Sequence, residues 1–384
     1  MSPATCIRDA ARIVVKVGSS LLLSDDGSVA DRWLESLAAD LAALQARGAA
    51  VSVVSSGAIG LGRRRLQLTG PLKLEEQQAA AAAGQSALMN AWQNALAPHD
   101  IVAAQVLLTL ADTEIRRRYL NARATLNTLL GLSAIPVINE NDTTATDEIR
   151  YGDNDRLAAH VAQMTGANAL VMLSDIDGLY DADPRATPSA THIPIVTDIT
   201  AAIMAMAGGP NAEAGAGSGG MVTKIEAAKI AAAAGCATII TKGEIERPLQ
   251  AILDGARATL FTPKESPETA RRAWIAGRLT PQGRIDIDAG AVDALAKGAS
   301  LLAAGVTRAS GAFGKGDAIS IFGPDGALVG QGLSAYEADE VRRIAGMQSA
   351  SVEKTLGYRR AAVVHRNDLT LRISAAPRLI KDRP

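Results

Sequence analysis

The sequence has few of the residues on which special chemistry usually depends. Only two of its 384 residues are cysteines, Cys6 and Cys236, which excludes a disulfide framework and a cysteine-rich zinc cluster. Its four histidines are scattered and form no metal-binding or nucleophile pattern, so we interpret each of them as structural. Aromatic residues make up 3%, which is too few for a platform that stacks nucleic-acid bases. A reducing, cytoplasmic environment is expected.

The chain also lacks a strong charge and a long apolar run. Its formal net charge is -1, so the arginine runs at 63–65 and 116–118 are interpreted as solvated faces. No apolar stretch reaches about 18 residues without a charge or a turn, and the amino terminus has no signal-peptide pattern. We therefore expect small molecules as ligands, and neither a membrane nor a nucleic acid as partner.

What is present is a regular alternation of two kinds of segment. From Arg12 to about Thr241, β-branched runs alternate with Ala/Leu-rich stretches, as in βαβ units. This predicts a three-layer α/β domain with a mainly parallel sheet over residues 8–265. The predicted strands are Arg12 to Val17, Ala50 to Val54, Ile101 to Leu107, Ile135 to Ile138, Ala169 to Leu173 and Ala237 to Ile240. The predicted helices include Asp31 to Arg47, Glu75 to Leu96, Asp112 to Leu130, Asp155 to Thr165 and Thr223 to Ala234.

The pattern changes near residue 266, and the length of the chain favours a second domain. Residues 266–282 contain Pro267 and Pro281 and are predicted to form a linker. Short runs separated by turn signals follow, and they predict a small β-rich domain over residues 283–370. Residues 371–384 have no periodic pattern and are expected to be frayed.

The most informative segment is Ile135 to Asp155, IPVINENDTTATDEIRYGDND. Here a predicted buried strand stops abruptly at a dense group of carboxylates and amides. Open α/β sheets bind ligands at the carboxyl ends of their strands, so the loop is a candidate for holding a polar ligand. The alternative is a solvated acidic loop, and this segment alone leaves both interpretations open.

Two other predicted strand ends have a composition suited to phosphate. The first strand leads into KVGSS, which includes Lys16 and Gly18, and the second leads into VVSSGAIG, which includes Ser56. Glycine lets backbone N–H groups approach a phosphate, while lysine supplies a mobile positive charge. Either turn alone could equally be an ordinary turn, because glycine and serine are common turn residues.

A glycine-rich loop, GAGSGGMVTK, runs into a helix predicted to begin near Val222. Lys224 in its first turn opposes the helix dipole, which indicates that an anion binds nearby. A formal GxGxxG match at Gly215, Gly217 and Gly220 lacks the opening βαβ unit, and no GxxxxGK[ST] motif occurs. Rossmann and P-loop sites are therefore both rejected.

One more strand end carries polar residues. Ser174 and Asp175 follow the fifth predicted strand in LSDIDGLYDADPR. By themselves they indicate an ordinary turn at a strand end. In a domain that handles phosphate they could instead contact a nucleotide or its metal.

Taken together, KVGSS, VSSGAIG, PVINENDTTATDEI, GDND, LSDIDGLYDADPR and GSGGMVTK resemble in order and spacing the bacterial glutamate 5-kinases of the amino-acid kinase family. The resemblance covers about residues 8–262, and residues 283–357 resemble a PUA domain. The NEND and GDND pair with this spacer is typical of these kinases. Acetylglutamate kinase, aspartokinase and carbamate kinase share the fold but not that pair.

The resemblance implies ATP-dependent phosphorylation of the γ-carboxylate of L-glutamate, the first step of proline biosynthesis. It further implies Mg²⁺ with the ATP and feedback inhibition by proline, with Thr143 to Tyr151 mobile and proline-sensitive. By motif position, Lys16 and Lys224 would contact the transferring phosphoryl group, and Asp155 would orient both lysines. Ser56, Asp142 and Asn154 would bind glutamate. The ATP-binding residues would be Lys16, Gly18, Ser174, Asp175, Ser218, Gly219, Gly220, Met221, Val222, Thr223 and Lys224.

Other activities stay open at the level of sequence. One is a different carboxylate or acyl kinase of the same fold, and another is RNA binding through the PUA-like domain. The mildly basic tail with few aromatic residues argues against RNA binding as the main activity. A homo-oligomer, either a dimer or a tetramer, and a partnership with glutamyl-phosphate reductase are also expected. The sequence names no metal ligands.

Overall fold

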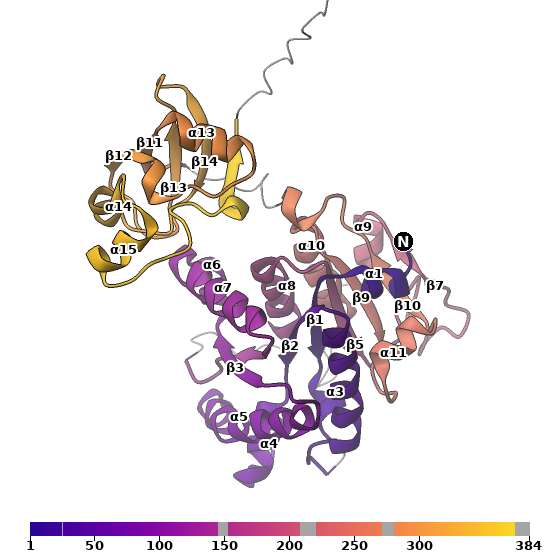
Figure 1. Cartoon of the computed structure of the whole chain (residues 1–384). Coiled ribbons are helices and arrows are strands. Elements are labelled where there is room, and N and C mark those ends of the chain that lie inside the picture. Colours follow the sequence, from indigo (N-terminus) through magenta and orange to yellow (C-terminus); the bar gives the residue numbers. More distant parts are fainter. Residues whose placement is uncertain (25, 145–152, 208–219, 271–279, 373–384) are drawn as a thin grey trace, which may run out of the picture. The chain divides into compact units, whose positions relative to one another are not determined.

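The computed structural model divides into two compact units, Met1–Pro267 and Glu268–Pro384 (Figure 1). It describes the chain except for residues 25, 145–152, 208–219, 271–279 and 373–384. Among the helices in the described ranges, none combines the length and the apolar character that a membrane span requires. Each unit has its own hydrophobic core, and the first unit contains the candidate site residues.

The first unit is built on an eight-stranded sheet with the order β3-β4-β2-β1-β5-β9-β10-β8. Neighbouring strands are parallel except for the antiparallel pair β9 and β10, so the predicted mainly parallel sheet is confirmed. Because β2 and β5 flank β1 on opposite sides, the strand order reverses there, which is where open α/β sheets bind ligands. The strands are β1 (Arg12–Val17), β2 (Ala50–Ser55), β3 (Ala103–Leu108), β4 (Ile135–Glu140), β5 (Ala169–Ser174), β8 (Ile195–Val196), β9 (Ala237–Lys242) and β10 (Ala258–Phe261).

Helices cover both faces of the sheet, which confirms the three-layer prediction. Alternate side chains of β1 enter two different cores, Val15 with the helices on one face and Val14 with those on the other. The first face packs against α1 (Pro3–Asp9), α3 (Asp31–Ala46), α4 (Ala58–Arg65), α5 (Leu74–Leu96) and α11 (Pro248–Leu253), and the second against α7 (Arg116–Gly131), α8 (Asp153–Thr165) and α10 (Met221–Ala233). Smaller elements are α2 (Ser19–Leu22), α6 (Leu110–Glu114), α9 (Ala201–Met206), the 3₁₀ helix η1 (Ala97–His99) and the two-stranded β6 (Leu179–Tyr180) and β7 (His192–Ile193).

One predicted helix was wrong in its continuity. Asp112 to Leu130 was expected to be a single helix, but α6 and α7 are separated at Ile115, whose backbone is extended with ψ 109°. The Asp112 N–H donates to the Thr109 hydroxyl, and the Thr109 N–H donates to the Asp112 carboxylate. This capping box begins a short helix two residues before the predicted start. Nothing in the sequence indicated the interruption, because it falls at the apolar residue Ile115 and not at a proline or a glycine.

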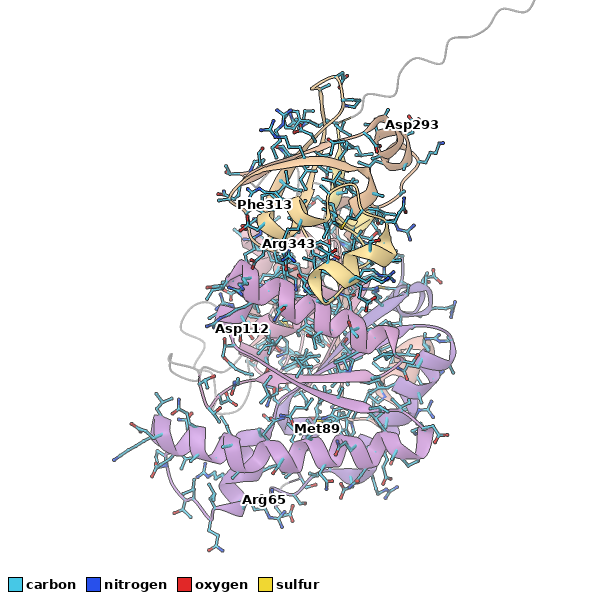
Figure 2. The ribbon with its side chains drawn as sticks, turned by 60° about the vertical axis from the view of Figure 1, so that its left-hand side comes forward. Arg65, Met89, Asp112, Asp293, Phe313 and Arg343 are labelled. Carbon is cyan, nitrogen blue, oxygen red and sulfur yellow. The ribbon has the colours of Figure 1, made fainter. Side chains whose placement is uncertain are left out.

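Helices α4 and α5 pack unusually closely because two glycines face each other. A Cβ added at Gly84 would lie 1.8 Å from the Ala58 carbonyl oxygen, and one at Gly62 would lie 1.7 Å from that of Ala80. No side chain fits at either position. Figure 2 shows Met89 on the sheet side of α5, whereas Arg65 of α4 lies at the solvent-facing side.

The second unit is β-rich, as predicted. Its five-stranded sheet has the order β12-β11-β13-β14-β15, and its core gathers apolar side chains such as Ile285, Ile321 and Val341. The elements are β11 (Gly283–Ile287), α13 (Ala289–Ala296), η2 (Ala303–Gly305), β12 (Val306–Gly311), β13 (Ala318–Phe322), β14 (Leu328–Leu333), α14 (Ala338–Ile344), α15 (Ser349–Leu356), η3 (Arg366–Asp368) and β15 (Leu369–Leu371).

Both cysteines are free thiols buried in the first unit. Burial, helped by the charge of Asp9, raises the pKa of Cys6 to about 11. Burial also raises the pKa of Cys236. Because the thiolate is the reactive form, burial and the raised pKa both disfavour reaction of these thiols at neutral pH.

Candidate active site

The predicted site residues that the structure describes lie where strands end and helices begin. Lys16 is the penultimate residue of β1, Ser56 follows β2, Asp142 follows β4, and Ser174 ends β5. Asn154 and Asp155 lie in the first turn of α8, while Gly220 caps α10 and precedes Met221, Val222, Thr223 and Lys224. The carboxyl ends of four neighbouring strands thus carry polar residues at the point where strand order reverses.

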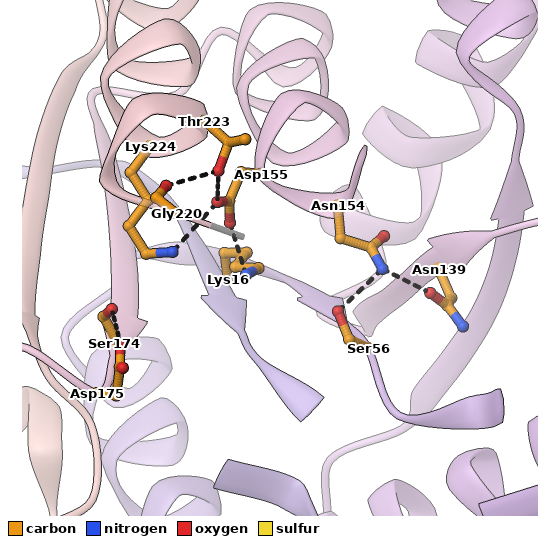
Figure 3. A network of polar contacts seen from close by, with 10 residues as sticks. All are labelled: Lys16, Ser56, Asn139, Asn154, Asp155, Ser174, Asp175, Gly220, Thr223 and Lys224. Atoms are coloured by element: carbon orange, nitrogen blue, oxygen red, sulfur yellow. Dashed lines mark hydrogen bonds and ion pairs between the residues drawn. The ribbon is translucent and has the colours of Figure 1, made fainter. Parts of the chain in front are cut away.

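A buried Lys–Asp–Lys cluster forms the centre of this region (Figure 3). Lys16 Nζ lies 2.6 Å from Asp155 Oδ1, and Lys224 Nζ lies 3.3 Å from Asp155 Oδ2. Lys16 points to the face of the sheet that holds α8 and α10, because Val14, two residues earlier in β1, belongs to the core on that face. The three elements β1, α8 and α10 therefore each contribute one charge.

The electrostatics of this cluster favour an anion. Asp155 is fully buried, and although burial alone would raise its pKa, the charges of Lys16 and Lys224 hold that pKa below its usual value. Burial lowers the pKa of Lys224, an effect that Asp155 opposes and the nearby Lys16 reinforces. By themselves the three groups carry a formal net charge of +1 in a region shielded from water, and the carboxylate of Asp175 also acts on Lys224. A bound anion such as a phosphoryl group would offset this positive charge.

The start of α10 is tied to the same carboxylate. Thr223 Oγ1 lies 2.9 Å from Asp155 Oδ2 and 2.8 Å from the carbonyl oxygen of Gly220. Met221 and Val222 are partly exposed in the first turn. The first N–H groups of a helix have no partner within the helix and can bind an anion. Ser218 and Gly219, also predicted to bind ATP, lie outside the described residues.

Gly18 lies beside the cluster. It caps the short helix α2, and a Cβ added there would lie 4.0 Å from Lys16 Nζ. A Cβ would fit at this position, and the φ of Gly18 is -75°, which any residue can adopt. The backbone at Gly18 therefore lies near Lys16 without requiring a glycine.

Ser174 and Asp175 form a separate polar pair at the end of β5. The Ser174 hydroxyl donates to Asp175 Oδ1 at 3.0 Å, and Arg185 Nη2 lies 2.6 Å from Asp175 Oδ2. Burial acts to raise the pKa of Asp175, but the hydrogen bonds from Arg185 and Ser174 outweigh it and lower the pKa. Arg185 was not predicted, and its position in a turn with several aspartates gave no signal of this ion pair.

A chain of amides joins β2, β4 and α8. Asn154 Nδ2 donates to Ser56 Oγ at 2.9 Å and to Asn139 Oδ1 at 3.2 Å (Figure 3). Asn139 is only 2% exposed. It was not predicted as a site residue, although it is the first residue of the NEND segment. Its amide in turn donates to Gln85 Oε1 of α5 at 2.9 Å. Gln85 stands within an alanine-rich helix, where sequence alone gives no hint of a role.

Asp142, the third residue predicted to bind glutamate, is 8% exposed and lies two residues after β4. Residues 145–151 of the segment expected to be mobile lie outside the described part of the chain. The structure thus brings Ser56 and Asn154 into contact and places Asp142 on the neighbouring strand end.

Among the described residues, no group of three or more His, Cys, Asp or Glu side chains is arranged to hold a metal ion. Magnesium usually keeps several waters and binds nucleotide phosphates rather than an all-protein cage.

Comparisons with known proteins identify the class. Residues 11–242 match the model of the amino acid kinase family, and residues 283–356 match that of the PUA domain. The chain therefore belongs to the amino acid kinase family, and a PUA domain follows its kinase domain in the sequence.

The similarity to individual proteins is narrower. The chain is 56% identical to glutamate 5-kinase from Rhizobium rhizogenes, in an alignment that covers 97% of this chain and 96% of that protein. It is 57% identical to glutamate 5-kinase from Paramagnetospirillum magneticum, covering 97% and 100%, and 57% identical to that from Caulobacter vibrioides, covering 94% and 97%. Within the amino acid kinases, the chain thus falls among the glutamate 5-kinases.

Proposed function

We propose that this protein transfers the γ-phosphoryl group of ATP to the side-chain carboxylate of L-glutamate and so forms L-glutamyl 5-phosphate. The observation that supports it most directly is the buried cluster in which Asp155 pairs with both Lys16 and Lys224. Two cations on one carboxylate leave a positive charge for the transferring group. The similarity to named glutamate 5-kinases supports the choice of acceptor.

The chemistry needs cations rather than a base. A glutamate side chain has a pKa of about 4.3 and is already ionised at neutral pH, so the nucleophile needs no proton acceptor. The barrier is the repulsion between two anions, which preorganised positive charges reduce in the transition state. Lys16 and Lys224 would each contact the phosphoryl group, and Asp155 would hold both ammonium groups in place.

The nucleotide and the amino acid would occupy adjacent parts of this region. Backbone N–H groups near Gly18 and at Gly220, Met221 and Val222, together with Ser218, Gly219 and the side chains of Thr223 and Lys224, would contact ATP phosphates. Ser174 and Asp175 would contact the nucleotide from the end of β5. Ser56, Asp142 and Asn154 would bind glutamate, with the carboxylate of Asp142 neutralising the α-ammonium group. Mg²⁺ would enter with ATP and supply charge neutralisation on the phosphates.

Several features of the cellular role belong to the same proposal. The product would be the first intermediate of proline biosynthesis, and it would be consumed by a glutamyl-phosphate reductase. Proline would inhibit from the glutamate site, because it shares the α-carboxylate and a cationic nitrogen with glutamate. The protein would act as a dimer or a tetramer in the cytoplasm.

The decisive measurement is ATP turnover with hydroxylamine trapping of the acyl phosphate. We expect hydroxamate with L-glutamate and far less with acetate, aspartate or N-acetylglutamate, and we expect added L-proline to reduce it. Turnover that is equally fast with another carboxylate would instead make this chain a kinase for that acid. If proline had no effect on hydroxamate formation, the proposed feedback inhibition would be refuted, while the proposed phosphorylation of glutamate would stand.

A further inference from the structure

The amide chain that ends at Asn154 has a fixed direction. The Glu140 N–H donates to Asn139 Oδ1 at 2.9 Å, and a backbone N–H can only donate. The oxygen of the Asn139 side chain must therefore face Glu140, and its nitrogen must face Gln85, which accepts at 2.9 Å. This removes the usual ambiguity over which end of an asparagine amide is which.

The orientation of the Asn139 amide in turn fixes the orientation of the Asn154 amide. Because Asn139 Oδ1 is an acceptor, Asn154 must turn its Nδ2 toward it, and both protons of that nitrogen are used by Asn139 and Ser56. Asn154 Oδ1 is buried and accepts no hydrogen bond from the described residues. In Figure 3 this oxygen points away from both Ser56 and Asn139. A buried acceptor without a donor is costly unless a ligand supplies one.

We propose that Gln85 is a positioning residue for the recognition of the α-ammonium group of the substrate. The Glu140 N–H sets the direction of the Asn139 amide, and Gln85, by accepting from Asn139 Nδ2, holds that side chain in place, so that Asn154 Oδ1 stays available as an acceptor for the ammonium. The proposal rests on the proposed function and adds a source of selectivity for amino acids over simple dicarboxylates. Gln85 would act through its hydrogen bond with Asn139 and not by binding the substrate itself.

The helix that carries Gln85 is well placed to fix it. Gly84, the preceding residue, packs so closely on α4 that a Cβ there would overlap the Ala58 carbonyl. Two turns further along α5, Trp92 Nε1 donates to Ser55 Oγ at 3.0 Å at the end of β2. The same face of α5 thus anchors the ends of β2 and β4, from which Ser56 and Asn139 contact Asn154.

The test compares Gln85→Met with the matched variant Gln93→Met. Gln93 is exposed on the same helix, so its substitution controls for adding a methionine to α5. Steady-state kinetics of the full-length enzyme would give KM for glutamate, KM for ATP and kcat, and the Ki of glutarate, which lacks the α-amino group. Gln85→Glu retains an acceptor oxygen and serves as the conservative rescue.

For Gln85→Met we expect KM for glutamate to rise about tenfold, while kcat and KM for ATP change by about threefold or less. The preference for glutamate over glutarate should fall by a similar factor, and Gln85→Glu should restore most of it. A parallel loss for glutamate, glutarate and ATP would show a general structural role and overturn the proposal. So would Gln85→Met behaving like Gln93→Met. A wild-type protein without glutamate turnover would instead refute the proposed function.

Discussion

Asn154 and Asp155 are consecutive residues in the first turn of α8, yet their side chains enter two different polar networks. Asp155 pairs with Lys16 and Lys224, whereas Asn154 donates to Ser56 and Asn139. Neighbouring helix residues diverge by about 100°, because there are 3.6 residues per turn. One turn of one helix therefore fixes the spacing between the cluster suited to a phosphoryl group and the amides suited to an amino acid.

Removing a lysine from the cluster should reduce turnover without unfolding the protein. Lys224→Ala and Lys16→Ala are each expected to lower kcat about a hundredfold or more, on the scale of losing one charge-stabilising donor. Lys229→Ala is the matched control, because Lys229 is exposed on the same helix as Lys224. Circular dichroism would verify the fold of each variant. Wild-type turnover by a folded Lys224→Ala protein would rule out the role proposed for this lysine.

Asp155 should make stability depend on pH in the acid range. Its folded-state pKa is lowered, so its contribution is complete above its unfolded pKa of about 3.9 and is lost as the pH falls through the folded value. At neutral pH, Asp155→Asn is expected to cost about 3–5 kcal/mol, because it leaves buried lysines unpaired. Urea unfolding at several pH values should show this difference shrinking below about pH 4. A difference independent of pH would contradict the assignment.

Asp142 should act on one substrate only. Asp142→Asn keeps the size of the side chain but removes its charge, and we expect KM for glutamate to rise about tenfold or more while KM for ATP stays unchanged. Initial-rate measurements with each substrate varied in turn would separate the two constants. Equal losses for glutamate and ATP would point to damage of the fold, since Asp142 is largely buried.

The close contact of α4 and α5 should not tolerate a methyl group. Gly84→Ala places a Cβ 1.8 Å from the Ala58 carbonyl oxygen, so the helices must separate, at a cost of about 1–3 kcal/mol or more. Gly131→Ala provides the control, because nothing lies within 4 Å of a Cβ added at that helix end. Thermal unfolding should show a lower Tm for Gly84→Ala alone. Equal Tm values for both variants would contradict the packing described for this pair.

The layers and strands of the first unit were predictable because their periodicity is strong. The alternation of β-branched and alanine-rich segments predicted the parallel sheet, and the six predicted strands lie within a few residues of β1, β2, β3, β4, β5 and β9. The short strands β8 and β10 were not predicted. Strand ends were less predictable. β2, β4 and β5 extend to Ser55, Glu140 and Ser174, polar residues that resemble loops in sequence but are held in the sheet by neighbouring strands. Tertiary pairing overrides local propensity at these points.

The site was predictable where its residues stand next to glycines or at abrupt changes of polarity. Lys16 and Lys224 met those conditions, whereas Asp155 was assigned to both lysines through the family resemblance; the structure brings the three together. Gln85 and Arg185 did not, because a glutamine in an amphipathic helix and an arginine in an acidic turn are ordinary surface residues in sequence. Asn139, the partner of Gln85, lies 54 positions away in the sequence, and Asp175, the partner of Arg185, lies 10 positions away. The contact between Gln85 and Asn139 is recognised only once the chain has folded.

The two buried thiols make this protein convenient for site-specific labelling. Maleimides react with accessible thiolates, and we expect little reaction of Cys6 and Cys236 at neutral pH because both thiols are buried and burial raises their pKa. A cysteine introduced on the surface of each unit could therefore carry a fluorophore or spin label without any prior replacement of native cysteines. Distances between such labels, measured with and without proline, would test whether the proposed inhibitor changes the separation of the two units.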